Sequence, residues 1–151
     1  MSYALTFQSR LPLTMRGQLE TMLFFNEGQH RVRHAIEATI ERYGLPEVVE
    51  INGALSLQIA KCPDVQILFA VQSADGGARP VGVVVYVRDS IERLTVLHLC
   101  VADDHATGGR FSSQHVLQRL LHQIRWVARR TQGVEHMALA YRGSQLRLAQ
   151  A

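Results

Sequence analysis

The fold of this chain is decided by the run LTVLHLCV (94–101), the polar loop ADDHATGGRFSS (102–113) and the run VEHMALAY (134–141). A long amphipathic segment separates the loop from the second run, so residues 94–142 read as strand, loop, helix and strand. Such a unit can form one right-handed crossover between two parallel strands. Because the helix N-terminus points its N–H groups at the loop, we expect a phosphate-bearing ligand first at residues 108–113.

The segment between the two runs predicts a helix over residues 113–131. Its apolar side chains recur at spacings of three and four residues, whereas its histidines and arginines lie mostly on the opposite face. The apolar face is expected to pack on the sheet, and Gly133 ends the helix. The apolar positions are Val116, Leu117, Leu120, Leu121, Ile124 and Val127.

The N-terminal part of the chain predicts one strand and two helices. Alternating apolar side chains over residues 3–9 have the period of a half-buried strand. Helical periodicity follows over residues 15–25, where Thr14 is placed to cap the first turn. A second helix is predicted over residues 29–43, because Gly44 and a proline soon after it form a usual helix stop.

The middle of the chain predicts an antiparallel meander. Asn52-Gly53 lies between two strand-like runs and indicates a hairpin, and SADGGARP (73–80) predicts an eight-residue polar turn. Short connections favour antiparallel pairing, so we predict an α/β fold whose mixed sheet is antiparallel up to Leu94 and parallel after the crossover, with helices on both faces. The meander strands are expected at 47–51, 54–60, 65–71 and 81–87.

Length and composition indicate one globular domain over residues 1–151. The chain is 47% hydrophobic, which suits a domain that folds alone. No apolar run approaches the roughly 18 residues of a membrane span, and MSYALTFQSR lacks the features of a signal peptide, so we expect a cytoplasmic protein. Cys62 and Cys100 are expected to stay reduced, with Cys100 acting as a small buried hydrophobe.

Positive charge is concentrated in the last third of the chain. From residue 105 onward there are seven arginines and one acidic residue, Glu135, which gives 7 − 1 = +6. This charge suits a phosphorylated ligand, and equally suits a helix face that is only solvated. Nucleic acid is not an expected partner, because the arginines lack clustered aromatic residues for base stacking.

The order of these elements resembles the GNAT-type N-acetyltransferase superfamily over about residues 3–142. The resemblance also rests on LCVADDHATGGRFSSQHVLQRLL (99–121), which is similar to the family's strand end, pyrophosphate loop and helix start. In that family the loop carries Arg or Gln, two residues, Gly, one residue, and then Gly or Ala. The resemblance implies a GNAT-like fold and acyl-coenzyme A-dependent acetylation of an amine, with acetyl-coenzyme A bound by the loop.

The resemblance also implies which residues hold acetyl-coenzyme A. Alignment by the helix leucines puts Gly108 at the Arg or Gln position, Phe111 at the middle glycine and Ser113 at the final small residue. Arg110 would supply the missing positive charge. The backbone of the first apolar run would align the pantetheine arm and donate to the oxyanion. The implied binding residues are Leu99, Val101, Gly108, Gly109, Arg110, Ser112 and Ser113.

Acyl transfer to an amine needs a base, an acid and N–H donors for the oxyanion. His98 is our candidate base, directly or through water, and Tyr141 is our candidate acid. Each has a plain alternative: His98 as a histidine satisfied within the sheet, and Tyr141 as a packed strand residue. A metal set built from His98, Cys100 and His105 lacks a fourth ligand, so no metal site is predicted. Asp103 and Asp104 are interpreted as solvated loop acids.

The end of the chain leaves a second function open. Members of the family continue with another helix and a closing pair of strands, whereas here only GSQLRLAQA (143–151) follows the last predicted strand. That strand is therefore expected to be an exposed edge, and we predict a homodimer formed through it or through the hairpin. The alternative function is a catalytically inactive domain that binds an acyl-coenzyme A or a protein partner.

Overall fold

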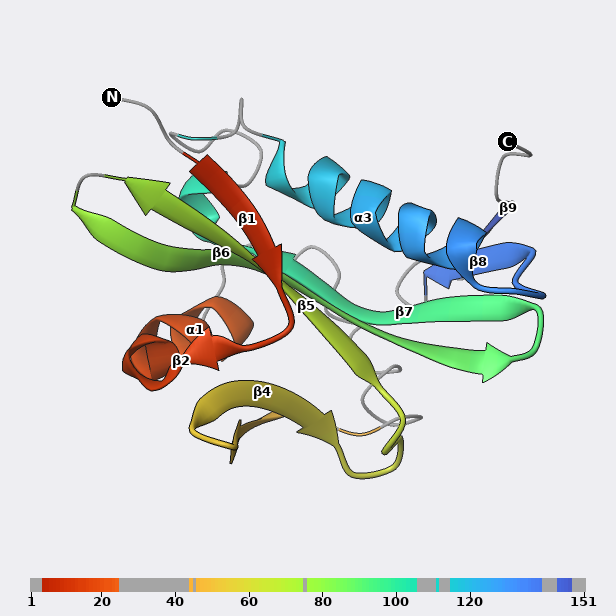
Figure 1. Ribbon diagram of the computed structural model, residues 1–151, viewed down its shortest axis with the longest axis horizontal. Helices are drawn as coiled ribbons and strands as arrows, with labels where there is room; N and C mark the ends of the chain where they lie inside the picture. The colour runs from red at the N-terminus through yellow and green to blue at the C-terminus, as the bar shows by residue number, and fades with distance from the viewer. Residues whose placement is uncertain are drawn as a thin grey trace.

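A computed structural model describes residues 4–24, 44, 46–74, 76–105, 111, 115–139 and 144–147. A six-stranded sheet with the order β1-β5-β6-β7-β8-β9 forms its centre (Figure 1). The strands are β1 (Ala4–Gln8), β5 (Gln66–Ala74), β6 (Gly77–Ser90), β7 (Arg93–Val101), β8 (His136–Leu139) and β9 (Ser144–Arg147).

The direction of the strands confirms the predicted mixed sheet. β1, β5, β6 and β7 pair antiparallel in that order, and β7 pairs parallel with β8. The crossover between β7 and β8 contains α3 (Val116–Arg130), which lies within the predicted helix. This helix begins only at Val116, because His115 before it adopts a left-handed backbone with φ of 53°.

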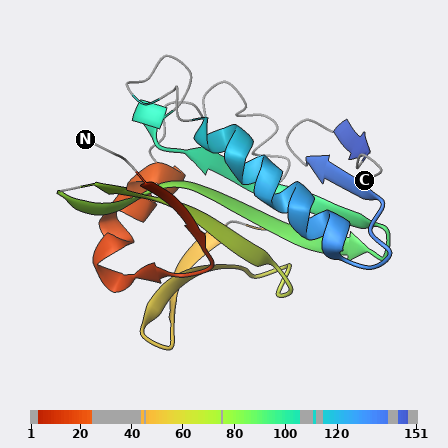
Figure 2. The same cartoon turned by 45° about the horizontal axis from the view of Figure 1, so that its top comes forward.

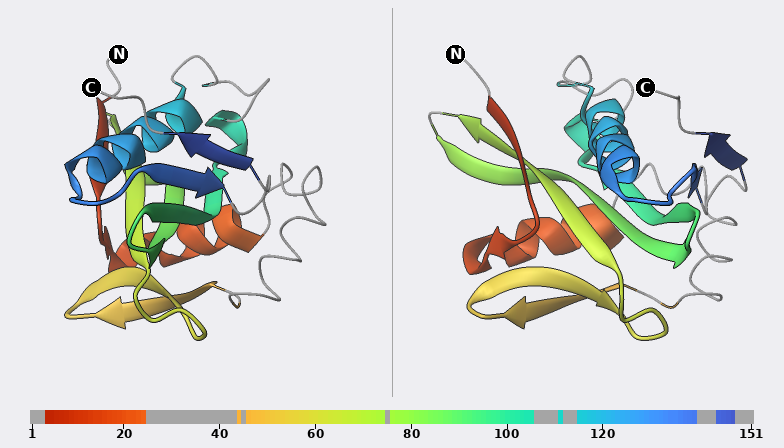
Figure 3. Two further views of the ribbon diagram at one scale, coloured as in Figure 1. Left: turned by 90° about the vertical axis from the view of Figure 1, so that its right-hand side faces the viewer. Right: turned by 45° about the vertical axis from the view of Figure 1, so that its right-hand side comes forward.

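The second helix packs on the other face of the sheet. A short 3₁₀ turn, η1 (Leu13–Met15), leads into α1 (Arg16–Phe24), which confirms the helix predicted over residues 15–25. The predicted cap was wrong: Pro12 occupies the N-cap position of η1, no side chain caps the turn, and Thr14 lies inside it. Figure 3 shows α1 and α3 on opposite sides of the central sheet.

The predicted hairpin forms, but it does not join the central sheet. β3 (Pro46–Ile51) and β4 (Ala54–Ile59) pair across Asn52 and Gly53, whose φ angles of 52° and 80° suit the tight turn that this dipeptide favours. β2 (Leu11–Pro12) pairs with the other edge of β4, which gives a separate three-stranded sheet. Figure 2 shows this small sheet on the same side of the central sheet as α1.

Two hydrophobic cores lie on opposite faces of the central sheet. The first lies between the sheet, α1 and β4, and the second lies between the sheet and α3. Alternate residues of β6 contribute to the two cores, as Val83 and Val85 do to the first and Val84 to the second. The small sheet lies on the α1 side of the central sheet because its apolar face, including Leu55, is buried in the first core.

Two further predictions were wrong about where strands end. The polar segment 73–80 is not an eight-residue turn, because β5 and β6 stay paired as far as Ala74 and Gly77. Gly77, with φ of 117°, permits the sharp reversal there. β8 is not the last strand either: β9 pairs antiparallel with it and covers the edge that we expected to be exposed. The homodimer stays a prediction.

The helix predicted over residues 29–43 lies outside the described residues. Among the helices that the structure describes, none has the length and apolar character required to span a bilayer. Both cysteines are free, and Cys100, predicted to be a buried hydrophobe, is partly buried and packs against the first core. Burial raises the pKa of the Cys100 thiol to about 12.

Candidate functional site

The parallel pairing of β7 with β8 is described over a short stretch. Their parallel register runs from Arg93 opposite His136 to Val96 opposite Leu139, whereas β7 continues to Val101. Beyond Val96, residues 98–101 pair with β6. This end of β7 leads, through the loop, to α3.

A β-bulge in β7 lies just beyond its last described pair with β8. Val85 pairs with His98 and Tyr86 pairs with Val96, which leaves Leu97 as the extra residue of β7. Beyond the bulge, Cys100 pairs with Val83 and packs against the first core. Because Val85 also belongs to the first core, the register places His98 on the α1 face of the sheet, the same face as Cys100.

His98 is buried at this bulge. Its side chain is 7% exposed, and desolvation lowers its pKa from 6.5 to about 4. The imidazole is therefore neutral at pH 7. The structure places it within β7 and outside the lining of the two cavities described below.

The other predicted site residues fall into two groups. Leu99 and Val101 lie in the part of β7 beyond the paired stretch, and both side chains pack in the second core. The remaining residues lie outside the described part of the chain, so the structure places none of them. They are Gly108, Gly109, Arg110, Ser112, Ser113 and Tyr141.

A polar cluster, which we call the loop anchor, connects the segment after β7 to β5 and β6. It consists of Gln72, Arg79, Asp104, His105 and Phe111. Nη2 of Arg79 lies 2.6 Å from Oδ2 of Asp104, and its Nε donates to Oε1 of Gln72 at 3.2 Å. Asp104 was predicted to be a solvated acid. That interpretation was wrong, because the β5–β6 ladder extends far enough to bring Arg79 against it.

His105 forms the buried part of the loop anchor. Its Nε2 lies 3.4 Å from Oε1 of Gln72, and its ring stacks on Phe111 with centroids 5.1 Å apart. Burial lowers the pKa of His105, and the charge of Arg79 lowers it further, against the opposing effect of Asp104. A neutral ring that donates from Nε2 suits this arrangement, since the amide oxygen of Gln72 can only accept.

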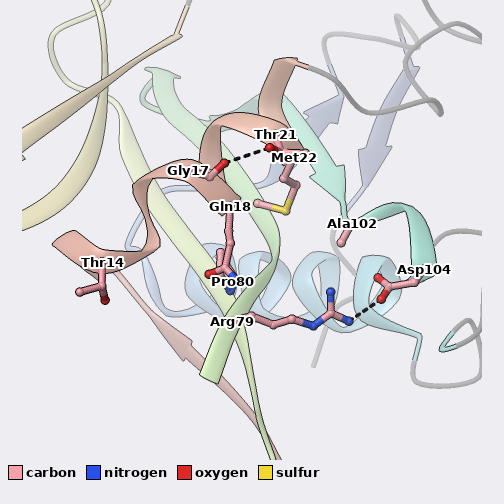
Figure 4. Close-up of a pocket in the computed structure, with 9 residues that line it drawn as sticks. All are labelled: Thr14, Gly17, Gln18, Thr21, Met22, Arg79, Pro80, Ala102 and Asp104. Carbon is pink, nitrogen blue, oxygen red and sulfur yellow. Dashed lines mark hydrogen bonds and ion pairs between the residues drawn. The ribbon is translucent and has the colours of Figure 1, made fainter. Parts of the chain in front are cut away.

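A cavity of about 620 Å³ adjoins the loop anchor on the α1 side (Figure 4). The Arg79–Asp104 ion pair lies at one end, and Gln18 of α1 approaches from across the cavity. The hydroxyl of Thr21 donates to the carbonyl of Gly17, so it is engaged within the helix. The lining residues are Thr14, Gly17, Gln18, Thr21, Met22, Arg79, Pro80, Ala102 and Asp104.

A second cavity, of about 460 Å³, lies at the start of α3. Arg119 extends over the ring of Phe7, with its Cζ atom 5.7 Å from the ring centroid. The groove combines one guanidinium, two imidazoles and two amides, which can all donate hydrogen bonds to an anion. Its lining residues are Phe7, His115, Gln118, Arg119, His122 and Gln123.

The cavity linings and the loop anchor were not predicted from the sequence. Arg79 lay in a segment interpreted as a turn, and Gln72 lay just beyond the predicted end of its strand. The available signal for the loop anchor was Arg79 itself, a charged residue close to a long predicted strand. Its partner Asp104 is 25 residues away, so the pairing could not be predicted from the sequence. The metal set considered earlier is not formed, because His98, Cys100 and His105 do not converge as a ligand group.

In comparisons with known proteins, no protein-family model and no curated protein matches the chain.

Proposed function

We propose that this chain is a GNAT-type enzyme that transfers an acyl group from acyl-coenzyme A, with acetyl-coenzyme A as the expected donor, to an amine. The observation that carries the proposal is the parallel crossover in which β7 leads through the loop and α3 to β8. The sheet order, the parallel crossover and the helices on opposite faces support it, because they agree with the fold that the resemblance implies.

Residues 97–101 of β7 are the proposed binding strand for the pantetheine arm of coenzyme A. Residues 97–101 span roughly 16 Å at about 3.3 Å per residue, which is long enough for an extended chain with two amide groups. Such a chain can lie beside a strand as an added strand does. In this proposal the backbone of Leu99 and Val101 aligns the arm, and residues 108–113 with Arg110 receive the pyrophosphate.

The cavity between α1 and the loop anchor is the proposed amine site. Its rim supplies hydroxyl and amide groups from Thr14 and Gln18, and its wall includes the apolar side chains of Met22 and Pro80. Because Arg79 and Asp104 neutralise each other, the cavity presents little net charge. This lining suits a neutral amine with an apolar body.

The reaction forms a C–N bond and breaks a C–S bond. The amine nitrogen attacks the acyl carbonyl carbon, and the resulting tetrahedral oxyanion is stabilised by backbone N–H donors. The nitrogen then loses a proton, and the coenzyme A thiolate leaves and gains one. Tyr141 is the proposed donor to the thiolate.

His98 is the proposed proton acceptor, through water. With a pKa of about 4 it is neutral at pH 7, but it has too little affinity for a proton to deprotonate a free ammonium ion. It can receive the proton only after C–N bond formation, when the nitrogen has become strongly acidic. The amine must therefore enter already neutral, which the apolar cavity wall favours.

The second candidate function is a domain that binds acyl-coenzyme A without catalysis. Two observations favour it. The two charged residues that line the cavity, Arg79 and Asp104, are paired with each other, and His98 does not line the cavity. Both functions require coenzyme A to bind, and only the first requires turnover. Release of free thiol from acetyl-coenzyme A with a panel of amines separates them.

Coenzyme A should raise the thermal unfolding midpoint by several degrees. At one hundred times the dissociation constant, binding to the native state stabilises it by about 2.7 kcal/mol. Differential scanning fluorimetry with coenzyme A and, as a control, with free pantetheine measures the effect. An unchanged midpoint at millimolar coenzyme A would contradict both candidate functions.

Replacing Arg110 should weaken coenzyme A binding without affecting the fold. Arg110→Ala is expected to cost about 1.5–3 kcal/mol of binding free energy, the range for a hydrogen bond to a charged group. The matched control is Arg125→Ala, which removes an exposed arginine from α3. If calorimetric titration gives equal affinities for the two variants, Arg110 does not belong to the site.

A further inference from the structure

A cluster of potential metal ligands lies at the start of β7 and β8, where the two strands pair. It is at the opposite end of β7 from the proposed acyl site. Glu92 lies in the turn between β6 and β7, and Glu135 and His136 lie where the chain enters β8. One ligand atom from each residue lies within 4.8 Å of the other two. We propose that these three side chains bind a first-row divalent cation of the Zn²⁺ type.

The spacing of the three side chains is close to that of a formed site. Two ligand atoms that each lie about 2.1 Å from one metal are at most roughly 4.2 Å apart. A small inward rotation of the side chains therefore brings ligand atoms that are up to 4.8 Å apart within reach of one ion. Both glutamates are exposed and His136 is half-buried, so their side chains have room to make that rotation. No movement of the backbone is needed.

The backbone beneath the cluster is already held in place. The amides of Glu135 and His136 both donate to the carbonyl of Glu92, at 2.7 and 2.9 Å. Arg88 donates to the carbonyls of Ile91 and Gln132, and so ties the turn before β7 to the segment before β8. A cation would order only three side chains, which keeps the entropic cost of binding low.

The charges around the cluster favour a cation. Two carboxylates and one imidazole suit Zn²⁺ or Mn²⁺, and three protein ligands leave room for water. Two of the nearby arginines are engaged elsewhere: Arg88 with backbone carbonyls, and Arg93 with Asp89 at 2.7 Å. Within the described residues, neither Glu92 nor Glu135 forms a salt bridge that would neutralise it.

The position of the cluster indicates a stabilising role. A cation held there would join the β6–β7 turn to the start of β8, where the two parallel strands are still paired. It would therefore strengthen the start of the β7–β8 pair. The site uses none of the residues proposed for acyl transfer, so it stands or falls independently of that function.

Calorimetric titration with Zn²⁺ tests the site, with the thiols kept reduced by a phosphine. The wild-type chain should bind Zn²⁺, and His136→Gln should weaken that binding at least about tenfold, as loss of even an indirect metal-site contact does. Glu92→Gln should act in the same direction. The matched control, His122→Gln, removes an exposed histidine on α3 and should leave the affinity unchanged.

A second measurement locates the ion independently of any variant. Mn²⁺ should selectively broaden the backbone amide NMR signals of Glu92, Glu135 and His136 at substoichiometric concentrations. Equal Zn²⁺ affinity for His136→Gln and the wild-type chain would overturn the proposal. So would Mn²⁺ broadening that is confined to other parts of the chain.

Discussion

Acidification from pH 6.5 to pH 4 is expected to lower the free energy of unfolding by about 3 kcal/mol through His98 alone. In the unfolded chain the imidazole regains its ordinary pKa of 6.5, whereas burial in β7 lowers the pKa to about 4. Between these values the unfolded state binds a proton that the folded state excludes. The stabilisation is therefore complete above pH 6.5 and is lost as the pH falls to 4, at about 1.4 kcal/mol per pKa unit.

Urea denaturation at a series of pH values measures this loss. His98→Gln removes the titrating group, so its free energy of unfolding should vary less between pH 6.5 and 4, whatever its absolute stability. His122→Gln, at an exposed position, should keep the slope of the wild-type chain. Burial lowers the pKa of His105 as well, so His105→Gln should remove a further part of the slope. A slope that His98→Gln leaves intact would contradict the assignment.

Gly82→Val is expected to destabilise the chain by about 3 kcal/mol, at the upper end of the range for overpacking. α3 lies directly on β6 at this glycine: an added Cβ would come within 2.7 Å of Cδ1 of Leu120 and 2.9 Å of Cγ1 of Val116. Both of those side chains are fully buried, so any rearrangement would have to occur within the second core. The helix would have to move away from the sheet, and the second core would open.

A double-mutant cycle tests the cause of this destabilisation. Leu120→Ala alone should cost a few kcal/mol through the cavity that it leaves. Combined with Gly82→Val, it should cost clearly less than the sum, because the new side chain fills that cavity. Gly53→Val is the control, since nothing lies within 4 Å of a Cβ there and only its φ of 80° opposes a side chain. Strict additivity of Gly82→Val and Leu120→Ala would show that contact with α3 is not the cause.

The two sites proposed above lie at opposite ends of β7. The acyl site uses the end of β7 that leads to the loop before α3, and the cation site uses the end where β7 pairs with the start of β8. The bulge at Leu97 and His98 lies between them, next to the last described β7–β8 pair. Because His98 is buried there, its protonation is expected to weaken the strand on which the proposed acyl site depends.

Local patterns in the sequence were sufficient to predict most of the elements. The helical spacing around Leu120 and Ile124 predicted α3, and alternation around Leu5 and Phe7 predicted β1. Asn52-Gly53 predicted the hairpin, because these residues tolerate positive φ. The length of the α3 segment then required a crossover, and so predicted that β7 and β8 are parallel.

Which strands pair at a distance was decided only by the tertiary structure. β4 takes β2 as its neighbour and not a strand of the central sheet, and β9 covers β8. Backbone hydrogen bonds are the same for any pair of strands, so the sequence of one strand does not identify its partner. The choice depends on which apolar faces can be buried together, as those of β4 and α1 are in the first core.

The crossover, the polar loop after β7 and the candidate base His98 were all predictable from local patterns in the chain. The surroundings that set the chemistry of these groups depend on the folded structure. Asp104 finds Arg79 at a separation of 25 residues, and His105 meets Gln72 at a separation of 33. A single extra residue at the bulge determines the face on which His98 is buried. Charge, burial and pKa depend on neighbours in space, and these neighbours are brought together only by packing of the whole sheet.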